Sequence, residues 1–167
     1  MTSYARCHLA ADTLLHNLAA STAAARDATA DQLADIGEVD ARRLYVPAGY
    51  PSMYAYCVEV LHLSEQAAYK RIQVARKARR FPAIFHAAAD GRLHLSAAIL
   101  LVPHLTEDTA EELVAAATHQ SKAEVERVLA ARFPRPDLPT VLEPIGWSRP
   151  SPEVVATTAP QVVQLSP

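Results

Sequence analysis

The spacing of apolar residues predicts helices over the first 133 residues of the chain and no convincing strand. Leu14, Leu15 and Leu18 share one side of a helix over residues 4–25. The same spacing, combined with residues typical of helix ends, marks seven more segments: 29–44, 53–61, 64–80, 83–89, 96–102, one that starts at 106, and 121–133. The predicted fold is therefore all-α, a compact multi-helix bundle.

Residues that suit helix ends support these boundaries. A serine or threonine at the N-cap accepts a hydrogen bond from the first turn, and Glu or Gln three residues later completes a capping box. The chain has such residues at five expected starts: Ser52, Ser64, Thr106 and the pairs Thr29 with Gln32 and Ser121 with Glu124. Gly91 can adopt the left-handed geometry that ends the segment before it.

The composition changes from Pro134 onward. Eight of the twelve prolines lie in the last 34 residues, among scattered Ser, Thr and Gln, and no helical period there could bury a face. We therefore predict a helical domain over residues 1–133 and a disordered, proline-rich tail over residues 134–167.

Positive charge is concentrated in one segment, although the formal net charge of the chain is −2. Six of the 16 Lys and Arg residues lie within residues 70–80, and no acidic residue lies within 66–80. In a helix, one stripe of this segment is polar and basic: Gln66, Lys70, Gln73, Lys77 and Arg80. A separate small apolar stripe can pack on a core: Ala68, Ile72 and Ala75.

Residues 52–80 have the parts of a helix-turn-helix-like unit: a short helix, a tight connection and a capped basic helix. Cations on such a helix neutralise phosphates, while Gln and Arg can bond base edges. We predict that it contacts duplex DNA with a salt slope near −5, for about five or six neutralised phosphates. Gln66 and Gln73 are the expected base-edge readers. The predicted contact set is Gln66, Lys70, Arg71, Gln73, Arg76, Lys77, Arg79 and Arg80.

Two other interpretations compete with DNA binding. The basic segment could pair internally with acidic residues that follow it: Glu107, Asp108, Glu111, Glu112, Glu124 and Glu126. Alternatively, the apolar segment 97–102 could make the domain a protein-interaction module that forms a homodimer or docks a partner nuclease. Nearby tyrosines are also ambiguous: we expect Tyr54 and Tyr69 in helix packing, and Tyr50 as an exposed contact.

Candidate catalytic and metal-binding groups follow no known pattern. The spacing of His86, His94, His104 and His119 matches no zinc or di-iron site. Glu59 and His62 form a single Glu-x-x-His pair, whereas a di-iron bundle needs two. We therefore expect no enzyme activity, no metal and no cofactor.

The cysteines and the apolar runs bear on location. Cys7 and Cys57 are expected to be reduced. The longest apolar candidate, residues 97–102, is far shorter than the roughly 20 residues of a membrane span. We expect a cytoplasmic protein with no membrane partner.

A series of short motifs runs through the predicted domain: Asp40-Ala-Arg-Arg-Leu-Tyr45, Gly49-Tyr-Pro-Ser-Met-Tyr-Ala-Tyr-Cys57, Leu61-His-Leu-Ser-Glu-Gln-Ala-Ala-Tyr-Lys-Arg-Ile72, Phe81-Pro-Ala-Ile-Phe85, Gly91-Arg-Leu-His-Leu95, Pro103-His-Leu-Thr106 and Ser121-Lys-Ala-Glu-Val-Glu126. This series resembles the amino-terminal helical region of bacterial HNH endonuclease-like proteins. In that family a proline-rich linker and a carboxy-terminal HNH nuclease module follow. This sequence has no Cys-x-x-Cys and no histidine after His119, so the catalytic residues of the family have no counterparts here. The resemblance implies a nuclease-associated, DNA-binding helical domain without its nuclease module.

Overall fold

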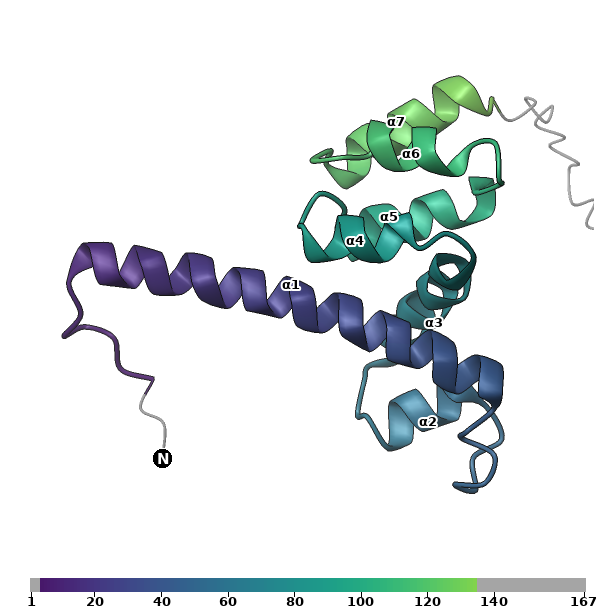
Figure 1. The fold of residues 1–167 in the computed structure, drawn as a ribbon, viewed down its shortest axis with the longest axis horizontal. Helices are drawn as coiled ribbons and strands as arrows, with labels where there is room; N and C mark the ends of the chain where they lie inside the picture. Colours follow the sequence, from purple (N-terminus) through teal and green to yellow (C-terminus); the bar gives the residue numbers. More distant parts are fainter. Residues whose placement is uncertain (1–3, 135–167) are drawn as a thin grey trace, which may run out of the picture. The chain divides into compact units, whose positions relative to one another are not determined.

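The structure, a computed structural model, describes residues 4–134. This part consists of seven α-helices and one 3-10 helix, with no strand (Figure 1). The elements are α1 (Ala11–Arg42), α2 (Met53–Glu59), α3 (Glu65–Arg80), α4 (Ala83–Ala89), α5 (Leu95–Leu101), η1 (Val102–His104), α6 (Ala110–Ala116) and α7 (Lys122–Arg132). The all-α prediction is therefore confirmed for these residues. From residue 135 on, the predicted tail lies outside the described residues.

Helix α1 is one continuous helix, whereas the sequence pattern predicted two. Thr29 does not cap a new helix, because its hydroxyl donates to the carbonyl of Ala25 at 2.7 Å. Thr22 bonds the carbonyl of Leu18 in the same way. A threonine can either cap a helix or bond back within one. The segment between residues 25 and 29 contains no glycine or proline to force a break.

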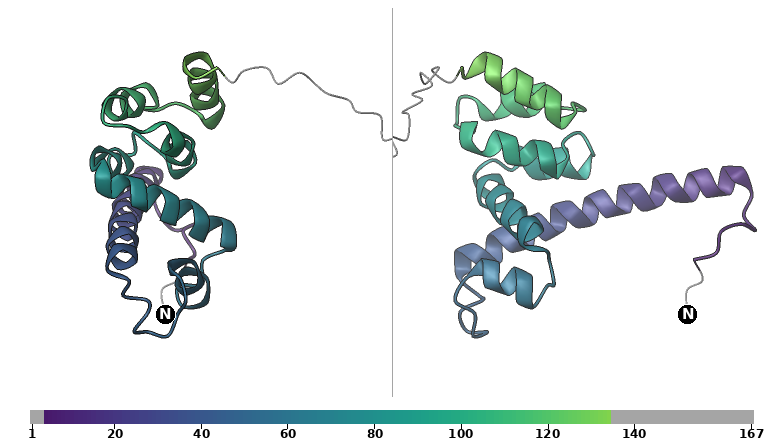
Figure 2. Two further views of the ribbon diagram at one scale, coloured as in Figure 1. Left: turned by 90° about the vertical axis from the view of Figure 1, so that its right-hand side faces the viewer. Right: turned by 180° about the vertical axis from the view of Figure 1, so that it is seen from behind.

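The carboxy-terminal half of α1 packs against α3 and α4 and forms one side of the core. Leu33 and Ile36 are fully buried there. Gly37 lets α3 approach closely, because a Cβ at this position would lie 2.9 Å from the Cγ of Arg79 and 3.2 Å from the carbonyl oxygen of Ala75. The last turns of α1 are thereby fixed on the carboxy-terminal half of α3, and Figure 2 shows the two helices crossing.

Helices α4 to α7 extend the core beyond α1 and α3. Contacts join α3 to α5, α4 to α6 and α5 to α7. Gly91 has the positive φ expected of it, 73°, and the capping box of Ser121 and Glu124 is present. The start predicted at Thr106 is wrong, because α6 begins at Ala110. Residues 107–109 form turns instead, and the Thr109 hydroxyl donates a hydrogen bond to the carbonyl of His104.

The amino-terminal half of α1 projects away from the other helices (Figures 1 and 2). Every residue from 11 to 28 is exposed, and we call this segment the α1 arm. Leu15 and Leu18 on it are 66% and 63% exposed. Within the described ranges, no helix is both long enough and apolar enough to cross a membrane.

Candidate nucleic-acid interface

The connection between α2 and α3 is short and held by side-chain caps. Ser52 accepts a hydrogen bond from the backbone N–H of Ala55, and Ser64 accepts one from that of Ala67 at 3.3 Å. Between the helices, His62 adopts a positive φ of 52°, and the N–H of Leu63 bonds the carbonyl of Cys57. Both serine caps confirm the sequence prediction. Local hydrogen bonding therefore sets the direction in which α3 leaves the turn.

Helix α3 is more deeply packed than its sequence suggested. The predicted apolar stripe is buried: Ala68, Ile72 and Ala75. Val74 and Ala78 are also fully buried, which widens the packed side to about half of the helix circumference. The reason is that four helices pack on α3: α1, α2, α4 and α5. Only the opposite side remains available to a ligand.

The arginines near the end of α3 are neutralised by carboxylates, mostly from α1. Arg76 makes a bidentate pair with Asp40, with its Nε at 2.7 Å from the carboxylate. Arg79 pairs with Glu38 at 3.4 Å, and Arg80 with Glu107 at 2.7 Å. Although residues 66–80 contain no acidic residue, three arginines of this segment are therefore paired within the domain: Arg76, Arg79 and Arg80.

These three ion pairs differ in strength. Asp40 is only 14% exposed, and its hydrogen bond to Arg76 raises the pKa of that guanidinium. Arg80 and Glu107 are 66% and 77% exposed, and pairs of that kind contribute about 0–1 kcal/mol. A phosphate can therefore exchange with Glu107 at little cost, but it would have to break a well-formed pair to reach Arg76.

The other cations of α3 have no carboxylate partner among the described residues. Arg71 faces α1, where its Nε donates to the side-chain oxygen of Gln32 at 2.8 Å. Lys77 donates to the carbonyl of Leu105 at 3.4 Å. Lys70 is half-buried and makes no hydrogen bond or ion pair within residues 4–134. Lys70 and Lys77 lie on the same stripe as Gln66 and Gln73, as the sequence predicted, whereas Arg71 does not.

Two tyrosines that were expected in the helix packing are exposed instead. Tyr69 is 57% exposed and Tyr54 is 41% exposed. With Gln66 and Lys70 they border an open depression of about 370 Å³ beside the first turns of α3. Partial burial and the neighbouring Glu65 raise the pKa of Tyr54. Tyr50, the expected exposed contact, packs edge-on against Tyr56 instead, with ring centroids 5.4 Å apart.

The segment expected to dock a partner is part of the core. Ala97, Ala98 and Leu101 of α5 are buried, whereas Ile99, Leu100 and Val102 are half-buried. His94 caps the start of α5, because its Nδ1 accepts a hydrogen bond from the backbone N–H of Ala97. Its Nε2 therefore carries the proton and donates to the carbonyl of Gln120 at 3.1 Å.

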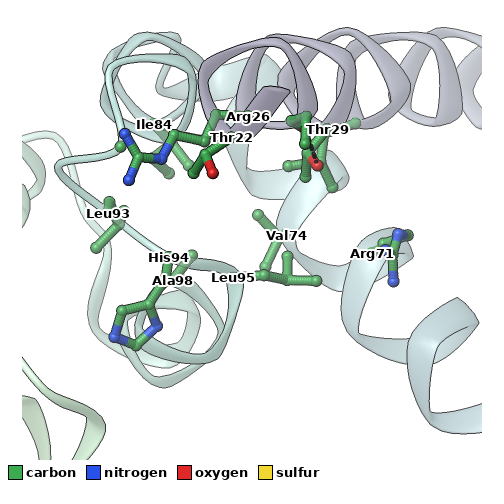
Figure 3. Close-up of a pocket in the computed structure, with 14 residues that line it drawn as sticks. Thr22, Arg26, Thr29, Arg71, Val74, Ile84, Leu93, His94, Leu95 and Ala98 are labelled. Atoms are coloured by element: carbon green, nitrogen blue, oxygen red, sulfur yellow. Dashed lines mark hydrogen bonds between the residues drawn. The ribbon is translucent and has the colours of Figure 1, made fainter. Parts of the chain in front are cut away.

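A larger groove of about 530 Å³ lies between α1, α3, α4 and α5. Its floor is apolar, with Val74, Leu93 and Leu95 prominent (Figure 3). Arg26 of the α1 arm and Arg71 lie at two separate edges of this floor. Gly91 leaves room for Arg26, because a Cβ there would come within 2.6 Å of its guanidinium.

Within residues 4–134, no cluster of three or more His, Cys, Asp or Glu side chains could hold a metal ion. Burial raises the pKa of the Cys57 thiol, which disfavours the reactive thiolate. The described residues therefore present a basic stripe on α3 and a groove beside it.

No family model, no curated protein and no solved structure matches the chain.

Proposed function

We propose that the described domain binds duplex DNA through one stripe of α3, on which Gln66 is exposed and Lys70, Gln73 and Lys77 are half-buried. The observation that carries the proposal is that Lys70 and Lys77 have no carboxylate partner within residues 4–134 and alternate along one stripe with Gln66 and Gln73. Two cations can hold the phosphate backbone while two amides reach base edges. Exposed Tyr69, on the same side, adds an aromatic surface that can pack against the sugar–phosphate backbone.

The proposed contacts are fewer than the sequence alone indicated. Arg76 and Arg79 are held by α1, and Arg71 faces α1, so none of the three is assigned a phosphate. Lys70 and Lys77 remain, joined by Arg80 when phosphate replaces Glu107. In a chain related to HNH endonuclease-like proteins, as the resemblance implies, this domain would hold DNA rather than cut it.

A salt titration of DNA binding tests the proposal. Two or three phosphate contacts predict a slope of about −2 to −3 in a plot of log affinity against log salt concentration. The measurement is fluorescence anisotropy of a labelled 20-base-pair duplex with the full chain, between roughly 20 and 200 mM salt. A slope near zero, or no binding at the lowest salt, would reject the proposal.

Removing the carboxylates that neutralise α3 should strengthen binding. The double substitution Glu38→Gln and Glu107→Gln frees Arg79 and Arg80 from exposed ion pairs. Each such pair is worth at most about 1 kcal/mol, so we expect a gain of up to about fivefold per arginine. Anisotropy at constant salt measures it. Glu126→Gln, which removes an exposed glutamate paired with Lys122 on α7, is the control and should change affinity little.

A further inference from the structure

The α1 arm continues the buried side of α1 beyond the core. Counting back from buried Leu33 in steps of four and three passes through Thr29, Arg26, Thr22, Ala19, Leu15 and Asp12. Leu18 lies beside this stripe, three residues after Leu15. The stripe is thus apolar or small from Leu15 to Thr22, and no described residue covers it.

The two charged residues that bound this stripe are unpaired. Asp12 has no cationic partner and Arg26 has no carboxylate partner within residues 4–134, whereas most other arginines of the domain have one. They are opposite in sign and lie 14 positions apart on the same stripe, with Ala19 midway. Arg26 rests against Gly91 at the edge of the groove in Figure 3, so its guanidinium is held near the base of the arm.

We propose that two copies of this chain associate through their α1 arms, packed antiparallel about a twofold axis near Ala19. In this register each Asp12 lies beside Arg26 of the partner subunit, and both charges of both arms are satisfied. A parallel arrangement would instead place like charges side by side. The two-fold axis makes the contact self-complementary, as a homodimer interface requires.

Side-chain sizes along the arm fit the same register. Leu15 of one copy comes to lie across from the small Thr22 and Ala23 of the other, and Leu18 lies across from Ala19. Leucines against small residues allow two helices to approach closely. The arm is about 27 Å long at 1.5 Å per residue, so the interface is at the small end of the range for specific dimers. We therefore expect a concentration-dependent dimer.

Sedimentation velocity of the full chain over a concentration series tests this proposal. The wild type should shift from monomer to dimer, and Leu15→Asp with Leu18→Asp should raise the dissociation constant by about a hundredfold or more. The matched control, Ala20→Asp with Ala24→Asp, introduces the same charges on the opposite side of the arm and should still dimerise. A wild type that stays monomeric throughout, or a dimer unaffected by the leucine substitutions, overturns the proposal.

Charge exchange and cross-linking test the antiparallel register. Asp12→Arg should weaken the dimer, and adding Arg26→Asp should restore it, because the pair is then inverted. In a Cys7→Ser background, Ala19→Cys should form a disulfide-linked dimer, whereas Ala24→Cys should not. Failure of the second substitution to restore association, or cross-linking through position 24 alone, overturns the register. Neither result depends on DNA binding, so these experiments test the dimer independently of the proposal for α3.

Discussion

Replacing Leu33 with alanine is expected to lower the free energy of unfolding by about 2–5 kcal/mol. Leu33 is only 1% exposed, and it lies where α1 packs on α3 and α4. Truncation removes apolar contacts and enlarges the groove that Leu33 lines. Because that groove is open to solvent, neighbouring side chains and water can partly fill the space, which favours the lower half of the range. Urea denaturation followed by circular dichroism measures the change.

Leu15→Ala provides the matched control on the same stripe of the same helix. Leu15 is 66% exposed, so its truncation should change the stability of the monomer by less than about 0.5 kcal/mol. Both variants are compared at a concentration low enough to keep the chain monomeric. Equal effects of the two substitutions would mean that the arm packs on the domain in solution, contrary to the structure.

The helices could be predicted well because the signals that define them are local. Ser52, Ser64 and Ser121 cap the helices that they were expected to cap, since each bond spans only three residues. The errors occur where one local signal has two outcomes. Thr29 bonds back within α1 instead of capping, and Thr106 precedes a turn rather than a helix. Sequence reasoning placed a boundary at each position.

The charge state of the candidate interface could not be predicted in the same way, because it depends on contacts between distant residues. Internal pairing was expected only with acidic residues that follow the basic segment, and of these Glu107 alone pairs with α3 among the described residues. Two pairing carboxylates, Glu38 and Asp40, come from α1, 36 and more positions before their partners. Asp40 had been noted only as part of a family-like motif.

The tyrosines illustrate the same limit. Tyr69 lies on the same side of α3 as exposed Gln66 and half-buried Gln73, at steps of three and four. Its exposure could therefore be predicted from this spacing once the packed side of the helix was known. The position of that side depends on Val74 and Ala78, which are buried because α1 and α5 both pack on α3. A single apolar stripe in the sequence did not indicate two packing partners.

Reversing the charge of the two unneutralised lysines should nearly abolish DNA binding. Lys70→Glu with Lys77→Glu removes two proposed phosphate contacts and adds two repulsive charges, so affinity at roughly 0.1 M salt should fall by about a hundredfold. The salt slope should also fall toward zero, by about 0.9 for each lost contact. Both values come from the same anisotropy titration as the wild type. Neither lysine is fully buried, so the variant should fold, which circular dichroism checks.

The control places the same charge change on α7. Lys122→Glu with Arg127→Glu also lowers the net charge by four, on side chains that are 61% and 76% exposed. Repulsion from charges that do not contact the DNA is weakened by screening at this salt concentration, so this variant should keep most of its affinity and an unchanged slope. Equal losses in both variants would mean that DNA responds only to the net charge of the domain. A smaller loss in the α3 variant than in the α7 variant would place the binding surface elsewhere. Only a loss confined to α3, accompanied by a shallower slope, agrees with a stripe of lysines and glutamines that holds the phosphate backbone.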